Sequence, residues 1–214
     1  MIWQDALQLF VVLIISLTVH EAAHALVAML GGDRTAYNGG QVTVNPLPHM
    51  QREPFGMVVL PLLSLFATNG QSCFGFAHAP YDPIWAWHHP RRAALMALAG
   101  PLANVLLAAV AFAVLALIAR PESDTERTIR TIAGTFLQLN LLLAVFNLVP
   151  LPPLDGAGVI GGLLPKTRRI FELIQNVPYS TIVVMVLLMR FLPVLFWPIF
   201  DKVNGWLPCP LLPR

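Results

Sequence analysis

The chain has 214 residues, of which 57% are hydrophobic and 11% charged, and its formal net charge is +2. Soluble domains carry about 25% charged residues, so this composition excludes an ordinary soluble domain and indicates a membrane protein. So small a net charge gives no reason to expect nucleic acid as a partner. The two cysteines show no CxxC or Cys/His spacing, which argues against a disulfide framework and a cysteine-ligated zinc site.

Residues 6–29 form the first apolar segment, and a helix of this length crosses a hydrocarbon layer of about 30 Å. The residues before it lack the positive charge of a signal peptide, so we expect this helix to be retained. Gly31 and Gly32 follow it and predict its end. The C-terminal half of the segment contains an HExxH motif, His20-Glu21-Ala22-Ala23-His24.

This motif is suited to binding a metal ion. On a helix, His20 and His24 lie one turn apart on the same face, so two imidazoles can reach one ion. Glu21 lies beside them and can act as a general base on a water molecule. The alternative is a pair of hydrogen-bonded histidines, with Glu21 paired to an arginine. Ionisable side chains inside a lipid-spanning helix are costly and usually mark function, which favours the metal site.

Residues 33–54 are more polar and contain a turn signal, Asn38-Gly39-Gly40, before the alternating run Gln41-Val42-Thr43-Val44. The pattern predicts a small β-hairpin or an edge strand near the metal site, and an ordinary connecting loop is an equal alternative. An exposed strand edge would let an extended polypeptide pair with the chain.

Residues 55–68 are apolar but too few for a span, and they include Pro61. This length favours a re-entrant or interfacial segment, whereas an extension of the apolar segment to Phe76 would permit a span.

Three further apolar segments follow, at residues 93–118, 132–153 and 177–200, and Arg190 interrupts the last. We therefore predict an all-α polytopic membrane protein. It is a bundle of about four to six transmembrane helices, with a re-entrant segment and a small β-hairpin near the active site. We expect a single membrane-embedded domain over residues 1–214, whose motifs fall within residues 10–165.

Charge placement predicts the orientation of these helices. If the first helix ends in the cytoplasm and residues 55–76 return to the same side, the connection 119–131 lies outside. That connection mixes three arginines with three acidic residues. Seven cations then lie inside: Arg34, Arg52, Arg91, Arg92, Lys166, Arg168 and Arg169. This is the bias of the positive-inside rule, and it places the HExxH motif nearer the cytoplasmic side.

A catalytic zinc ion needs a third protein ligand and an open position. The remaining histidines lie in polar connections: His49, His78, His88 and His89. Asp155 instead follows an apolar span, in a segment broken by prolines at 150, 152 and 153, where irregular backbone must be buried in protein or line a cavity. A turn or helix N-cap is the alternative role for Asp155, since Asp-Gly is a strong turn signal. Its apolar flanks favour the ligand role.

Three motifs resemble one family: His20-Glu21-Ala-Ala-His24, Ala99-Gly100-Pro101-Leu-Ala-Asn104 and Phe146-Asn147-Leu-Val-Pro150-Leu-Pro-Pro-Leu-Asp155-Gly156. They are similar to motifs of the site-2 protease family of intramembrane zinc metalloproteases, in its short bacterial-type members without a PDZ or CBS domain. In place of the Gly-Arg or Ser-Arg that often follows Asp-Gly there, this chain has Ala157-Gly158.

The resemblance implies an intramembrane endopeptidase in a bacterial inner membrane, acting on peptide bonds in or near transmembrane segments of membrane protein substrates. It implies His20, His24 and Asp155 as ligands of one catalytic zinc ion and Glu21 as the catalytic acid and base. The resemblance also implies that Asn147 and Asn104 are polar supports near the site.

His49 is a further candidate donor to the oxyanion, for which an ordinary loop histidine is the simpler interpretation. Two alternative functions fit the sequence less well. A non-catalytic zinc-binding scaffold would have no chemical need for Glu21. A metal transporter would ordinarily show paired repeats, and the sequence shows no such internal symmetry.

Overall fold

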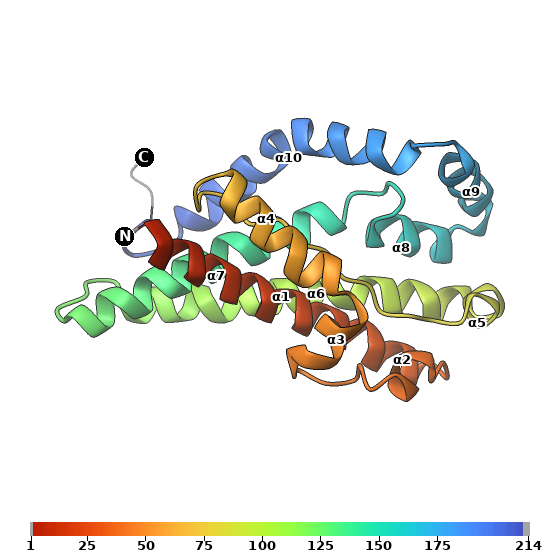
Figure 1. Ribbon diagram of the computed structural model, residues 1–214, viewed down its shortest axis with the longest axis horizontal. Helices are drawn as coiled ribbons and strands as arrows, with labels where there is room; N and C mark the ends of the chain where they lie inside the picture. The colour runs from red at the N-terminus through yellow and green to blue at the C-terminus, as the bar shows by residue number, and fades with distance from the viewer. Residues whose placement is uncertain (1, 212–214) are drawn as a thin grey trace. The chain divides into compact units, whose positions relative to one another are not determined.

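The computed structural model describes residues 2–211, and these are about 76% helical with no β-strand among them. The all-α prediction is therefore confirmed (Figure 1). In chain order the helices are α1 (Ile2–Leu30), α2 (Thr35–Asn38), α3 (Pro46–Arg52), the π-helical turn η1 (Phe55–Val59), α4 (Leu60–Ala67), α5 (Pro83–His88), α6 (Pro90–Leu117), α7 (Asp124–Asn147), α8 (Asp155–Leu163), the 3-10 turn η2 (Pro165–Thr167), α9 (Arg168–Asn176) and α10 (Ser180–Asn204).

Four helices in the described part of the chain are long and apolar enough to cross a membrane: Trp3–Leu30, Pro90–Leu117, Asp124–Asn147 and Ser180–Gly205. They contain 28, 28, 24 and 26 residues, more than the roughly 20 that a hydrocarbon layer requires. The protein is thus an integral membrane protein, with the lower number of spans that the sequence predicts.

The chain divides into two compact units, Met1–Ala103 and Asn104–Arg214, and the division falls inside α6. That the whole chain forms one domain stays a prediction.

In the first unit, hydrogen bonds hold the chain that follows α1. The carbonyl of Gly31 accepts hydrogen bonds from Trp85 Nε1 at 3.1 Å and from Arg92 Nη1 at 3.1 Å. Gly32 turns the chain with a φ of 102°, which favours glycine. These contacts tie the end of α1 to α5 and to the first turn of α6.

Asp33 adds a second tie at the same place. Its carboxylate accepts hydrogen bonds from Thr35 N at 2.9 Å, Thr35 Oγ1 at 2.6 Å and Asp82 N at 2.8 Å. Burial opposes ionisation of this carboxyl, but the hydrogen bonds from Thr35 and Asp82 outweigh it and lower the pKa of Asp33.

The predicted β-hairpin is wrong: residues 41–45 form an irregular segment between α2 and α3, with bends at 42–44. On both sides of this segment, hydrogen bonds at the helix ends occupy the backbone groups that a strand would use. Gln41 N donates to the carbonyl of Ala36 at 3.0 Å, and Asn45 Oδ1 caps α3 by accepting from Leu47 N at 3.1 Å. Pro46 then begins α3. The alternating run over residues 41–44 is therefore too short to form a β-ladder, and it has no partner strand in the described chain.

Residues 55–76 form a helix followed by a non-helical return. The helix ends at Ala67, which excludes one continuous span to Phe76. Asn69 and Gly70, with positive φ angles of 52° and 80°, reverse the chain. The return segment then brings Phe76 N to within 3.1 Å of Gly56 O, at the start of η1. The approach depends on glycine, since a Cβ at position 56 would lie 2.2 Å from the Phe76 carbonyl oxygen.

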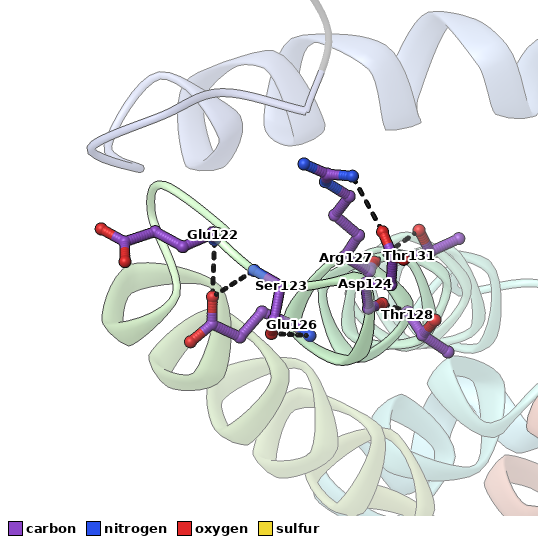
Figure 2. Close-up of polar contacts among 7 residues, drawn as sticks. All are labelled: Glu122, Ser123, Asp124, Glu126, Arg127, Thr128 and Thr131. Atoms are coloured by element: carbon purple, nitrogen blue, oxygen red, sulfur yellow. Dashed lines mark hydrogen bonds and ion pairs between the residues drawn. The ribbon is translucent and has the colours of Figure 1, made fainter.

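In the second unit, a capping box starts α7 (Figure 2). Ser123 Oγ accepts from Glu126 N at 3.2 Å, and Glu126 Oε2 accepts from Ser123 N at 3.3 Å and from Glu122 N at 2.6 Å. Arg130, one turn further on, donates to the carbonyls of Leu115 and Ile118 at the end of α6. These contacts fix the tight connection between α6 and α7.

A buried amide pair joins the same two helices deeper in the unit. Asn104 Nδ2 donates to Asn140 Oδ1 at 2.8 Å, and both side chains are fully buried. Small and apolar residues pack around the α6–α7 contact: Ala108, Ala111, Leu115, Ala133, Leu137 and Leu207. Small residues allow the close backbone approach that membrane helices need when no hydrophobic effect drives them together.

Candidate metal centre

The two histidines of the HExxH motif converge, as the helical spacing predicts. His20 Nε2 and His24 Nε2 lie 2.9 Å apart, and their rings meet edge to face. Both residues are buried in the first unit, with 5% and 7% of their surfaces exposed. Two imidazole nitrogens held this close can share a cation between their lone pairs.

The orientation of the His24 ring comes from α6. Its Nδ1 lies 2.7 Å from the backbone carbonyl of Met96, an acceptor, so Nδ1 carries the proton. In the neutral ring Nε2 is then left with its lone pair, directed toward His20. A hydrogen bond from the far ring nitrogen to a carbonyl is the usual support of a metal-binding histidine.

Glu21 lies beside the histidines and is almost fully buried, with 2% of its surface exposed. Its Oε2 is buried and accepts no hydrogen bond from the residues that the structure describes. The ligand atoms of His20, Glu21 and His24 all lie within 4.8 Å of one another. A buried carboxylate oxygen without a donor is unfavourable unless a proton or a cation accompanies it.

Gly100 of α6 forms one wall of the centre. A Cβ at this position would lie 2.3 Å from His24 Nε2 and 2.5 Å from His20 Nε2. The bare backbone therefore reaches the two nitrogens, and any side chain would fill the space in front of them. Two imidazole ligands, a buried carboxylate oxygen beside them that can accept a proton from water, and this space suit a catalytic zinc ion that takes a third protein ligand. The residues present fit the ion.

Sequence reasoning missed the contributions of Gly100 and Met96. The Ala99-Gly100-Pro101 motif predicts close helix approach, but no local signal identifies the histidine nitrogens as what the glycine meets. The carbonyl of Met96 has no sequence signal at all, because every residue offers the same backbone acceptor.

The other candidate residues each have a hydrogen-bond partner in the described chain. His49 is buried on α3, with its Nε2 2.9 Å from the carbonyl of Thr43, so it braces the loop before that helix. Asn104 is bound to Asn140, and Asn147 Nδ2 donates to Leu143 O of its own helix at 3.0 Å. These contacts are structural, and the predicted roles of His49, Asn104 and Asn147 at the site stay predictions.

Asp155 is half-buried and is the first residue of α8 in the second unit. Leu154 occupies the N-cap position, so the N-cap alternative for Asp155 is excluded. The structure thus brings together His20, Glu21 and His24, and the ligand role of Asp155 stays a prediction.

Fold and site together define a helical integral membrane protein whose first spanning helix carries a buried HExxH cluster that could hold a metal ion. Comparison with known proteins agrees. The profile of Peptidase family M50 matches residues 116–190. The chain is 35% identical over 199 residues to "Putative zinc metalloprotease YwhC" of Bacillus subtilis, covering 90% of this chain and 85% of that protein.

Two proteins of the same description named Rip2 are also similar. The one from Mycolicibacterium smegmatis is 30% identical over 81% of this chain and 64% of its own length. The one from Mycobacterium tuberculosis H37Rv is 33% identical over 90% of this chain and 67% of its own length. No solved structure matches the chain significantly. The chain belongs to Peptidase family M50, the site-2 protease family, and is a zinc metalloprotease.

Proposed function

We propose that the protein is an intramembrane endopeptidase that hydrolyses peptide bonds in or near transmembrane segments of membrane protein substrates. The observation that carries the proposal is the position of the metal centre inside a spanning helix. His24 lies six residues before the end of α1 at Leu30, which is about 9 Å along the helix axis. A centre at that depth meets peptide bonds near the end of a substrate's spanning segment.

His20 and His24 hold the zinc ion, and Asp155 is the third ligand. A carboxylate in the first turn of α8 suits this role, because the helix N-terminus favours negative charge there. When bound, the ion lowers the pKa of a water molecule and polarises the scissile carbonyl. Glu21 takes the proton from that water and delivers it to the leaving amine. Asn147 and His49 are proposed to assist at the developing oxyanion, and Asn104 to support the site through its helix.

A substrate helix must unwind before cleavage, since its carbonyls are bonded within the helix. We assign the gate for this step to residues 55–76, entering the membrane as a re-entrant segment. The return of Phe76 to Gly56 supports this assignment, because the segment leaves and comes back to one point. We also propose a bacterial inner membrane, and the positive-inside bias supports a site nearer the cytoplasm.

The experiment that tests the function compares the wild type with Glu21→Gln in liposomes containing a library of single-span substrates. Glu122→Gln is the matched control, since it makes the same change at an exposed glutamate. We expect Glu21→Gln to lower the cleavage rate about 100- to 10,000-fold, the range that a general base contributes, with zinc retained. Equal cleavage by wild type and Glu21→Gln would overturn the proposed role of Glu21, and no cleavage by either protein would favour the scaffold function.

A further inference from the structure

The connection between the α8 and α10 helices contains a short amphipathic helix, α9 (Figure 1). At 100° per residue, its apolar side chains fall on one face: Ile170, Phe171, Leu173 and Ile174. The opposite face carries polar and charged residues. Helices of this composition bury the apolar face either in the protein or in the edge of a bilayer.

Only part of the apolar face is covered by the protein. A Cβ on Gly161 of α8 would lie 3.5 Å from Arg168 Cγ and 3.7 Å from Phe171 Cδ2, so these side chains pack on α8. Arg168 Nε also donates to Gly161 O at 2.9 Å. By contrast, Ile170 and Leu173 are 56% and 62% exposed.

The exposed apolar surface continues through the flanking residues. Before and after α9, four further side chains are 56% to 78% exposed: Leu163, Leu164, Val177 and Tyr179. Together with Ile170 and Leu173 they form an apolar surface along residues 163–179. Such a surface is unfavourable in water but is expected where a helix lies in lipid.

The place of α9 in the chain puts it at a membrane surface. The spanning helix α10 begins at Ser180, directly after this connection. Tyr179 has a left-handed backbone, with φ 61°, so α10 does not continue the direction of α9. A helix that ends at the mouth of a span and does not join it lies at the level of the lipid headgroups.

The charges identify the lipid. Residues 163–179 contain three cations and one acid, Glu172. Arg168 is held on α8, whereas Lys166 and Arg169 are exposed and form no hydrogen bond or ion pair with the rest of the described chain. Basic side chains beside an exposed apolar face complement a bilayer surface that carries negative charge.

We propose that residues 163–179 form an interfacial helix that inserts Ile170 and Leu173 among lipid chains and binds anionic headgroups through Lys166 and Arg169. The occupant of this surface is the anionic leaflet of the bilayer. Because α9 is bonded to α8, and α8 begins with Asp155, lipid binding also steadies the proposed third ligand. That last consequence rests on the proposed function, whereas the lipid contact does not.

The test places a fluorescent probe at Leu173→Cys in the full-length protein, with both native cysteines replaced by serine. Gln175→Cys, on the polar face, is the matched control. The protein is reconstituted in phosphatidylcholine vesicles that contain brominated phosphatidylglycerol or brominated phosphatidylcholine. We expect strong quenching at position 173 and weak quenching at position 175. At position 173, brominated phosphatidylglycerol should quench at a lower mole fraction than brominated phosphatidylcholine.

The dependence of this lipid preference on charge is tested with Lys166→Gln/Arg169→Gln, which removes both positive charges. We expect the preference for phosphatidylglycerol to fall about tenfold, whereas Arg34→Gln/Arg52→Gln, which removes the same charge elsewhere, should leave it unchanged. Equal quenching by both lipids in the wild type, or an equal loss in both double variants, would overturn headgroup binding at α9. Quenching by neither lipid would overturn the interfacial position and indicate a protein partner.

The same measurement on the Glu21→Gln variant separates the two proposals. Lipid preference should persist there, because the contact requires no catalysis. If the protease proposal fails, the lipid result is still read directly from the probe.

Discussion

Glu21 and Asp33 are both buried carboxylates of the first unit, one inside α1 and the other in the turn after it, with 2% and 5% of their surfaces exposed. Asp33 accepts three hydrogen bonds, from Thr35 and Asp82. Glu21 Oε2 accepts none from the described residues. The chain is therefore able to satisfy a buried carboxylate with its own donors, and it does so where the role is to fasten a turn.

The second unit supports the same distinction inside a spanning helix. Asn104 and Asn140 satisfy one another at 2.8 Å although they are fully buried. Buried polar groups in folded proteins are nearly always paired, so an unsatisfied oxygen beside two converging histidines indicates a partner that the polypeptide does not supply. The proposed metal ion with its reacting water would supply that partner.

The variant Asp155→Ala is expected to have the largest effect. If Asp155 is a zinc ligand, we expect zinc affinity to fall by at least about 100-fold, since even residues that only support a ligand contribute 10- to 100-fold. Asp124→Ala is the matched control, because Asp124 is also the first residue of its helix and is exposed. Zinc stoichiometry measured by mass spectrometry decides the point, and unchanged zinc in Asp155→Ala would remove Asp155 from the site.

Gly100→Ala should have the next largest effect. The added methyl group would overlap both histidine Nε2 atoms, so the rings must move, and misplacement of about 1 Å can cost 100-fold in rate. Gly134→Ala is the control: its methyl group would meet only the end of the Leu211 side chain, at 3.3 Å. We expect cleavage to fall about 100-fold in the first variant and to persist in the second. Full activity in Gly100→Ala would show that the backbone at Gly100 does not approach the two histidine nitrogens this closely.

What the sequence predicted here was local, and what it missed was long-range. The i, i+4 spacing places His20 and His24 together on any helix, and the length of the apolar segment makes that helix a span. The contact of Gly100 with their nitrogens joins residues far apart in the chain, and helix periodicity carries no information on it. The same holds for the hydrogen bond of His24 to Met96.

The hairpin failed for a local reason. Alternation over residues 41–44 is a weak strand signal, and Asn45-Pro46 directly after it is a strong helix start. The buried position of His49 follows from that helix, since it faces back onto Thr43. A helix-cap signal directly after a short alternating run is therefore the stronger predictor of local structure than the run.

A smaller effect is expected from the asparagine pair. Asn104→Leu leaves the amide of Asn140 buried without this donor, which should cost about 1–3 kcal/mol of unfolding free energy. The double variant Asn104→Leu/Asn140→Leu should recover part of that loss, because no amide of the pair is left unsatisfied. Denaturation in mixed detergent micelles measures both. Additive losses would contradict a direct bond, and loss of zinc without loss of stability would give Asn104 a role at the metal centre instead.

The smallest expected effect is the pH dependence of the stability that the hydrogen-bonded carboxylate of Asp33 contributes. The pKa of Asp33 is lower in the folded protein than its ordinary value of 3.8, so its charged form stabilises the fold above that pH. This contribution is lost as the pH falls from about 3.8 through the lower native pKa. Asp33→Asn should therefore be less stable than the wild type at pH 6, by about 1 kcal/mol, and the difference should shrink at pH values below the ordinary pKa. Thermal unfolding of both proteins in detergent measures it. A constant difference across this range would mean that the Asp33 contacts hold equally well without the charge, and the contrast with Glu21 would then rest on hydrogen-bond count alone.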